Sequence, residues 1–182
     1  MPIPKEISPP ACPSFSGDLK LEIDVLLESN VKAINPAIQK LMRILRKTCC
    51  AAEHEFAVET ALREALANAI VHGNRMDPAK KVQLCCGCDA SGAVVIIVKD
   101  EGEGFDPGGV PSPLSGESVD ADHGRGIFLI HQLMDDVCFE GNGREIRMRK
   151  NALGSNARRR AQGKNLFPVR AISSEGCGPA HE

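Results

Sequence analysis

The chain has 182 residues, of which 42% are hydrophobic and 25% are charged, and its formal net charge is −2 at pH 7. This composition supports one domain with a hydrophobic core, and the slightly acidic balance argues against a dedicated nucleic-acid-binding protein. No apolar run approaches the ~20 residues that span a bilayer, and the first residues lack the apolar stretch of a signal peptide, so we expect a cytoplasmic protein without membrane contact.

The N-terminal part of the chain predicts a flexible arm, one strand and one helix. Residues 1–17 are rich in proline, serine and glycine and form the arm. Between Leu19 and Val25 apolar residues alternate with charged ones, which is typical of a half-buried strand. Asn35-Pro36 then predicts the start of a helix with Asn35 as its N-cap. Away from its apolar stripe, this helix carries either a solvated face or a basic surface for an acidic protein partner, made of Lys40, Arg43, Arg46 and Lys47.

A second, longer helix is predicted from Glu53 to His72, with Gly73 as the residue that ends it. Within it Glu64, Asn68 and His72 follow one another at four-residue intervals, so they share one face of an α-helix. A carboxylate and an amide are costly to bury without a purpose. The face is therefore either exposed to solvent or part of a binding site.

Residues 81–88 and 93–99 predict two strands joined by a turn. The second is continuously apolar, which suits a central strand covered on one face by helices. The first contains Cys85, Cys86 and Cys88, which include one CxxC spacing, whereas a structural zinc site normally needs a second such pair. We therefore predict reduced thiols in the core or at strand ends rather than metal or redox chemistry.

The second of these strands ends at Asp100, which is followed by Gly102 and Gly104. Spaced glycines after a strand-end carboxylate let the backbone approach a flat ligand closely, although an ordinary acidic turn has the same composition. The loop that continues to Asp122 is long and dense in glycine, proline and acidic residues. Such loops are usually functional lids or disordered segments.

His123 and the stretch 124–127 (G-R-G-I) open the next predicted helix. Free N–H groups and the helix dipole at such an N-terminus suit a phosphate group, and a plain glycine-rich helix start is the alternative. Neither the P-loop motif nor the three-glycine dinucleotide motif is present. A hairpin over residues 137–150 closes the domain, and residues 151–182 are predicted to be a disordered basic tail.

Together the three clusters resemble a known set of motifs. E-x-x-x-N with H-G, then D-x-G-x-G after a strand, then G-x-G at a helix start are similar to the N, G1 and G2 boxes of the GHKL (Bergerat-fold) ATPases. That superfamily includes gyrase, Hsp90, MutL and histidine-kinase catalytic domains. Within it, the stretch from about Leu19 to Lys150 most resembles the RsbW-like anti-sigma factor serine/threonine kinases. The resemblance implies an α+β two-layer sandwich over residues 18–150, with a mixed, mostly antiparallel sheet covered on one face by α-helices.

The resemblance also implies a role for each motif residue. Asn68 would bind a Mg²⁺ ion that bridges the phosphates of ATP, and Glu64 would act as general base or orient the accepting hydroxyl. Asp100 would accept a hydrogen bond from the adenine amino group, with Gly102 and Gly104 shaping the pocket beneath the base. Residues 124–126 would hold the phosphates, and residues 107–122 would form a lid. The other residues expected at the nucleotide are His72 and Asn74 in supporting roles, His123 as the hinge of the lid, and Gly124, Arg125, Gly126 and Ile127.

For function, the resemblance implies a serine/threonine protein kinase that uses ATP to phosphorylate a small STAS-type antagonist protein and so regulates a sigma factor by partner switching. A homodimer is expected from the family, without direct contact to nucleic acid. Two alternatives stay open. One is a nucleotide-gated module that binds a sigma factor or another partner without turnover, and the other is a stand-alone histidine-kinase-like ATPase domain.

Overall fold

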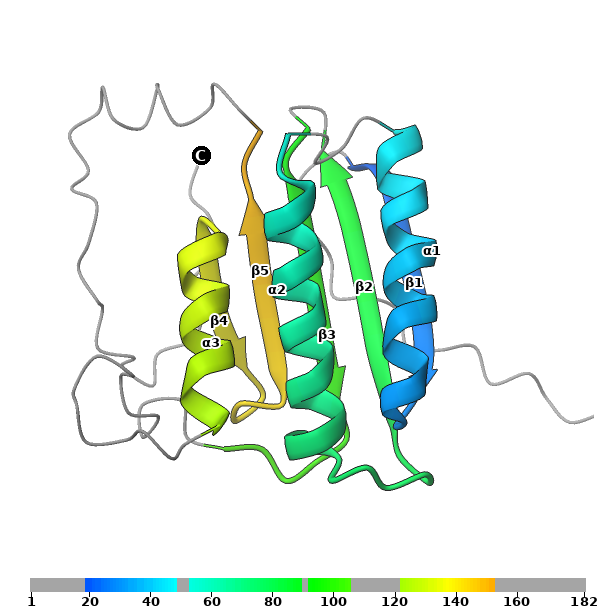
Figure 1. Ribbon diagram of the computed structural model, residues 1–182, viewed down its shortest axis with the longest axis vertical. Helices are drawn as coiled ribbons and strands as arrows, with labels where there is room; N and C mark the ends of the chain where they lie inside the picture. The colour runs from blue at the N-terminus through cyan, green and yellow to red at the C-terminus, as the bar shows by residue number, and fades with distance from the viewer. Residues whose placement is uncertain (1–18, 49–52, 90–91, 106–121, 153–182) are drawn as a thin grey trace, which may run out of the picture.

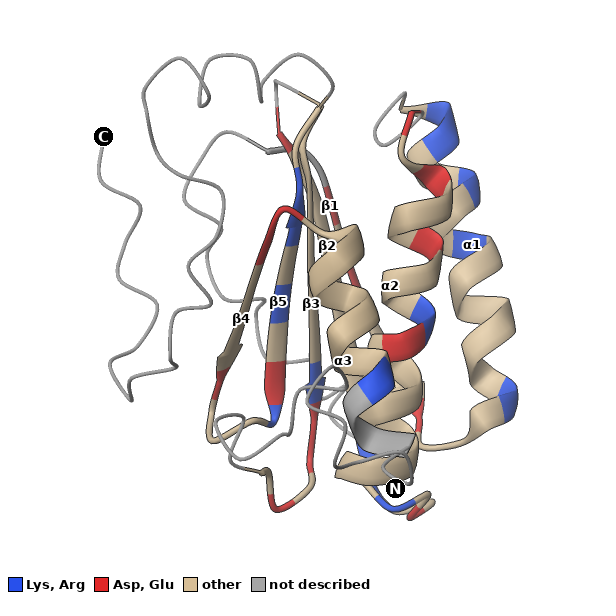
Figure 2. Ribbon diagram, turned by 60° about the vertical axis from the view of Figure 1, so that its left-hand side comes forward, with Lys and Arg blue, Asp and Glu red and all other residues tan. Residues whose placement is uncertain are grey.

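The computed structural model describes residues 19–48, 53–89, 92–105 and 122–152 (Figure 1). They form two layers, a five-stranded sheet and a layer of helices that covers one of its faces (Figures 1 and 2). The α+β two-layer fold with a one-sided helical cover is thereby confirmed. The predicted arm, most of the lid and the tail lie outside the described residues. Within the described part, no helix has the length and apolar character needed to cross a membrane.

The sheet has the strand order β1-β2-β3-β5-β4. The strands are β1 (Leu19–Glu28), β2 (Lys81–Asp89), β3 (Val94–Asp100), β4 (Asp136–Glu140) and β5 (Glu145–Lys150). Each neighbouring pair is antiparallel, so the described sheet is wholly antiparallel where a mixed sheet was expected. The continuously apolar segment, β3, is the central strand, as its sequence predicts.

The hydrophobic core lies between the sheet and the helices. On β3, Val94, Ile96 and Val98 alternate with residues of the other face and are at most 1% exposed. Their partners on the neighbouring strand β5 include Met148 and Ile146, which are buried in the same core. Full burial of a side chain such as Ile96 stabilises the fold by roughly 1.5–3 kcal/mol. This packing fixes β3, and with it the position of Asp100 at the end of the strand.

The helices are α1 (Ile34–Lys47), α2 (Glu55–Ala67) and α3 (Asp122–Leu133). The predicted N-cap of α1, Asn35, is wrong, because a 3₁₀ turn over Val31–Ala33 leads into the helix. Asn30 caps that turn, and its Oδ1 accepts a hydrogen bond from the Lys32 N–H at 3.0 Å. The Asn35 side chain instead accepts a hydrogen bond from Arg63 of α2, so it ties the two helices together.

The cysteines of the described strands differ in state. Cys86 and Cys138 are free thiols, and burial raises the pKa of the Cys86 thiol to about 12. Cys85 and Cys88, which project from opposite faces of β2, are each disulfide-bonded. The prediction of reduced thiols is therefore wrong for these two, because a disulfide depends on which sulfur atoms the fold brings together rather than on sequence spacing.

Candidate functional site

The three motif clusters lie at one edge of the sandwich, at the bottom of Figure 1. Glu64 lies in the last turn of α2, Asn68 directly follows that helix, and Asp100 is the last residue of β3. Helix α3 starts at the same edge and packs against α2. The fold therefore brings together segments that the sequence separates by several elements.

Gly126 lets the start of α3 approach the polar end of α2. A β-carbon at Gly126 would stand 2.7 Å from Oε2 of Glu64 and 3.5 Å from Nδ2 of Asn68. Real β-carbons do not make the shorter contact, so only glycine permits this packing with Glu64 in its present position. The structure thus brings Glu64, Asn68 and Gly126 into one cluster.

Helix α3 begins at Asp122, so Gly124 lies in its first turn and Gly126 beyond the residues whose N–H groups are free. The N–H groups free at a helix N-terminus are those that precede the first intrahelical hydrogen bond, here residues 122–124 of the described helix. They include the backbone of His123 and Gly124, and they suit an anion such as phosphate. Gly126 is the fifth residue, so its contribution is the missing side chain rather than a free N–H group. The predicted place of residues 124–126 at the phosphates stays a prediction.

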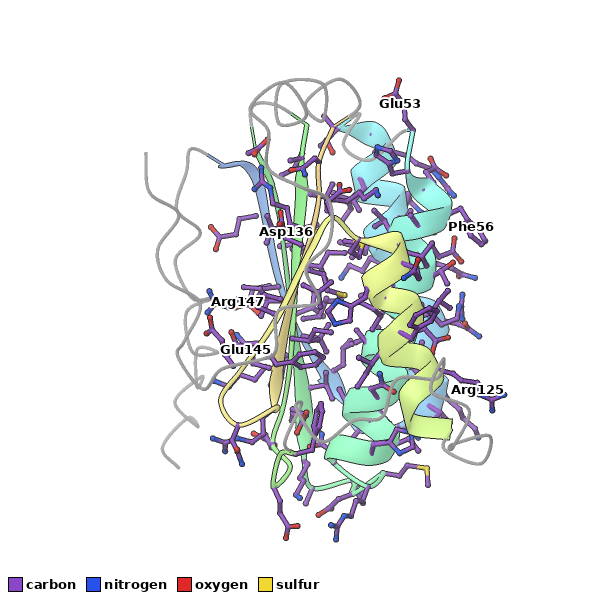
Figure 3. All side chains as sticks on the ribbon, turned by 90° about the vertical axis from the view of Figure 1, so that its left-hand side faces the viewer. Glu53, Phe56, Arg125, Asp136, Glu145 and Arg147 are labelled. Atoms are coloured by element: carbon purple, nitrogen blue, oxygen red, sulfur yellow. The ribbon has the colours of Figure 1, made fainter. Side chains whose placement is uncertain are left out.

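Two further predicted nucleotide residues lie along α3. Arg125 is exposed and points away from the helix layer (Figure 3), and Ile127 is half-buried. The side chain of His123 lies outside the described residues. Its backbone lies in the first turn of α3, and its role as a hinge stays a prediction.

The end of α2 departs from α-helical geometry. Its last segment, Asn68–Gly73, is a π-helix (η2), closed by a hydrogen bond from the Asn74 N–H to the Ala69 carbonyl at 2.8 Å. Such π-turns inside helices are frequent at functional sites. The predicted α-helix through His72 is therefore wrong in its last turn. His72 is exposed.

Gly73 has a different role from the predicted helix terminator. The left-handed residues that turn the chain are Arg75 and Met76, each with φ of 56°. At Gly73 a β-carbon would stand 2.5 Å from Cγ of Asp100. At Gly102 a β-carbon would stand 2.1 Å from the Gly73 carbonyl oxygen. The two glycines let the π-helix pack its backbone directly against the end of β3.

Asp100 is a buried carboxylate at the end of β3. The residue is 8% exposed, and its Oδ1 accepts a hydrogen bond from the Gly102 N–H at 2.8 Å. Burial raises the pKa of the Asp100 carboxyl, while that hydrogen bond and the positive charges of Arg144 and Lys80 offset part of the rise. A buried acceptor of this kind suits a polar N–H donor such as the amino group of a base.

The turn between β4 and β5 supports the loop after Asp100, and sequence reasoning missed this contact. Gly104, with φ of +82°, would carry a β-carbon 2.1 Å from the Asn142 carbonyl oxygen. The Phe105 N–H donates a hydrogen bond to that same carbonyl at 2.9 Å. Phe105 also packs edge-to-face on Phe139 of β4, with ring centroids 5.6 Å apart. The available signal was the Gly141-Asn142-Gly143 run, which predicted only a hairpin turn.

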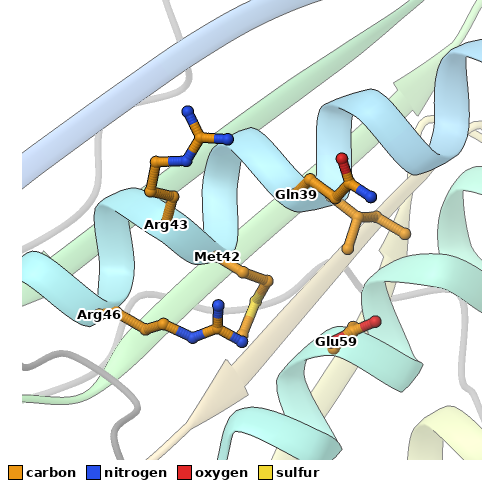
Figure 4. A pocket seen from close by; sticks show the side chains of 6 residues that line it. Gln39, Met42, Arg43, Arg46 and Glu59 are labelled. Carbon is orange, nitrogen blue, oxygen red and sulfur yellow. The ribbon is translucent and has the colours of Figure 1, made fainter.

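A hollow of about 210 Å³ lies elsewhere, between α1 and α2 (Figure 4). Its lining residues are Ile38, Gln39, Met42, Arg43, Arg46 and Glu59. None of them belongs to the three clusters, so this hollow is separate from the candidate site. Its rim carries two ion pairs, Arg46–Glu55 at 3.0 Å and Arg63–Glu59 at 3.1 Å.

Comparison with known proteins agrees with this geometry. The family model of the histidine kinase-like ATPase domain matches residues 27–150. The anti-sigma F factor of Heyndrickxia coagulans is 30% identical over 105 residues, which cover 54% of this chain and 71% of that protein. The region that the family model matches contains all three motif clusters and the strands β2 to β5, together with the last two residues of β1.

Proposed function

The chain belongs to the GHKL superfamily as a histidine kinase-like ATPase domain of the anti-sigma factor type, and we propose that it is an ATP-dependent serine/threonine protein kinase. Its substrate is a small antagonist protein, and its output is control of a sigma factor by partner switching. Binding of ATP follows from the family. The observation that carries the kinase proposal is the cluster of Glu64 and Asn68 against Gly126 at the start of α3.

In this proposal the free N–H groups of the first turn of α3 bind the phosphates. Glu64 takes the proton of the accepting hydroxyl while the oxygen of that hydroxyl forms a bond to the γ-phosphorus. The bond between the γ-phosphorus and the bridging oxygen breaks, and ADP leaves with that oxygen. The protein contributes mainly positioning and electrostatic stabilisation, as in phosphoryl transfer generally.

Asn68 is the proposed ligand of Mg²⁺. In phosphoryl-transfer sites this ion takes few protein oxygens and completes its shell with phosphate oxygens and water. A side-chain amide beside the start of α3 fits that donor set. When bound, Mg²⁺ would supply neutralisation of the charge on the phosphates.

Asp100 is the proposed base-recognition residue, with Gly102 and Gly104 beneath the base. Its burial supports this role, because a buried carboxylate strongly favours a ligand that donates a hydrogen bond. His72, His123, Arg125 and Ile127 remain proposed neighbours of the nucleotide.

The basic face of α1 is the proposed docking surface for an acidic protein partner. Lys40, Arg43, Arg46 and Lys47 are exposed on it, and the hollow beside α2 gives a partner side chain a place to enter. Charge complementarity of this kind raises association rates and selects partners. The name of the relative, an anti-sigma factor, supports a sigma factor or its antagonist as the partner. A homodimer in the cytoplasm completes the proposal.

The test is transfer of the γ-phosphate from radiolabelled ATP to candidate antagonists, followed by phosphoamino-acid analysis. Wild type is expected to yield phosphoserine or phosphothreonine. Glu64→Gln should abolish transfer while ATP affinity stays within about twofold, because a general base acts in the chemical step. Glu53→Gln is the matched control, since Glu53 precedes α2 at the opposite end from the site (Figure 3).

Two outcomes would argue against the kinase, and a third against the proposed role of Glu64. Tight ATP binding and partner capture with no phosphoprotein would favour a nucleotide-gated binding module. Acid-labile phosphohistidine would favour a histidine-kinase-like domain. Equal transfer by Glu64→Gln and wild type would remove Glu64 from the chemistry.

A further inference from the structure

Asn74 is the most completely buried polar side chain described near the site, with 0% exposure. It directly follows the π-helix and lies one residue beyond Gly73. Its Nδ2 donates a hydrogen bond to the Lys81 carbonyl at 2.9 Å. Its Oδ1 accepts a hydrogen bond from the Glu101 N–H, also at 2.9 Å. These two partners fix the orientation of the amide, because one can only accept and the other can only donate.

A third hydrogen bond closes these contacts into a ring. The Lys81 N–H donates to Oε2 of Glu101 at 2.7 Å. The Asn74 side chain thus donates to Lys81, the Lys81 backbone donates to Glu101, and the Glu101 backbone donates back to Asn74. The ring joins the end of the π-helix, the first residue of β2 and the first residue after β3.

The ring stands where the ladder between β2 and β3 stops. The last registered pair is Val82 with Asp100, and the next residues along the two strands are Lys81 and Glu101. Asn74 therefore takes the place of further strand pairing at this point. It holds the backbone directly beside Asp100, while its own chain leads back through Gly73 to Asn68.

We propose that Asn74 is a positioning residue that sets the distance between Asp100 and Asn68, and through it the preference for adenine. This inference rests on the proposed roles of Asp100 at the base and Asn68 at the phosphates. Asn74 is not itself a ligand, because its side chain is enclosed and both ends of its amide are bonded within the protein. Supporting contacts of this kind decide whether a site is held in its productive geometry.

The close packing around Gly73 makes the position of Asp100 sensitive to Asn74. The Asp100 carboxylate lies against Gly73 with no room for a methyl group. A shift of the Glu101 backbone after loss of the Asn74 amide would move Asp100 relative to this contact. Misplacement by about 1 Å can cost on the order of a hundredfold in function.

The experiment measures affinities for ATP and for inosine triphosphate, which carries a carbonyl in place of the amino group that Asp100 would bind. Wild type should prefer ATP. Asn74→Ala should lower that preference by about tenfold or more, while binding to the triphosphate common to both nucleotides is largely kept. The matched control is Asn151→Ala, since Asn151 is a buried asparagine at 7% exposure that accepts a hydrogen bond from Arg149 beyond the end of β5.

Asn74→Asp covers the case in which Asn74→Ala does not fold. It keeps the size and the acceptor for the Glu101 N–H but turns a carboxylate toward the Lys81 carbonyl, so the preference should again fall. A folded variant at position 74 with the wild-type ratio of ATP to inosine triphosphate affinity would overturn the inference, even if it melts at a lower temperature. Failure of the proposed role of Asp100 looks different, because wild type itself would then show no preference for ATP, and failure of the kinase is read separately as absence of phosphate transfer.

Discussion

Gly126 of α3 lies directly against Glu64 of α2, so close that a β-carbon on the glycine would stand 2.7 Å from the carboxylate oxygen. This contact sets the first prediction. Gly126→Ala should displace the Glu64 carboxylate, because the far end of that side chain is the part able to move. We expect phosphate transfer to fall by about tenfold or more, as for loss of a positioned general base, with little change in melting temperature.

Parallel measurements of transfer rate and thermal unfolding check this expectation. Leu129→Ala is the control, since Leu129 lies further along α3 and is 37% exposed. Unchanged transfer in a folded Gly126→Ala protein would show that the contact with Glu64 has no part in the reaction.

The second prediction separates Gly102 from Gly73. A β-carbon at Gly102 meets the backbone carbonyl of Gly73, whereas one at Gly73 meets the side chain of Asp100. Gly102→Ala should therefore destabilise the fold by roughly 1–3 kcal/mol, as for other overpacked positions. Gly73→Ala should lose less stability and more ATP affinity. Denaturant unfolding measures the loss of stability in each variant, and nucleotide titration measures the loss of ATP affinity. A Gly73→Ala protein that loses more stability and less ATP affinity than Gly102→Ala would contradict the prediction.

The third prediction concerns pH. Burial raises the pKa of Asp100 above its ordinary value of 3.8, so the folded state holds this proton more tightly than the unfolded state. The contribution of Asp100 to stability is therefore most favourable at low pH and is lost as pH rises from 3.8 through the raised pKa. Asp100→Asn should stabilise the fold near neutral pH more than near pH 3.8, while it weakens ATP binding.

The free energies of unfolding of wild type and Asp100→Asn, measured from pH 3.8 to neutral pH, test this prediction. In wild type, ATP affinity should also fall as the pH drops and Asp100 takes up its proton, because a carboxyl with a proton is a poorer acceptor for the adenine amino group. A stability difference between the proteins that does not vary with pH would refute the linkage.

The fourth prediction concerns the basic face of α1. Arg43→Gln removes a positive charge that lines the hollow between α1 and α2. Association with an acidic partner should slow by several-fold at low salt, and the difference should shrink at high salt because ions screen the charge. Binding kinetics at two ionic strengths measure this. Lys99→Gln, on the sheet face away from the helices, should leave association unchanged.

Much of the architecture could be predicted because its signals are local. Alternating and continuous apolar runs identified the strands, and the burial of Ile96 and Val98 on β3 follows from them. The three polar and glycine clusters also pointed to one site. The sequence carried residue types and spacing, which decide these features before any long-range contact is known.

What could not be predicted depends on contacts between distant segments. Gly73 resembles an ordinary helix terminator until Asp100 is placed beside it. The π-turn has no signature of its own in the sequence, so an α-helix was predicted through His72 where the chain forms a π-helix. The support of Phe105 by the turn at Asn142 joins segments from two hairpin-like regions. Each of these features arises from tertiary packing rather than from local propensity.

The ring around Asn74 makes unequal demands on the three residues that form it. Lys81 takes part only through its backbone N–H and carbonyl, so homologous chains can carry almost any residue there except proline, which has no N–H. Glu101 contributes a carboxylate oxygen and a backbone N–H, so glutamine is an admissible replacement. Asn74 must both donate and accept over a fixed short reach, and we expect natural variation to be narrowest at this position.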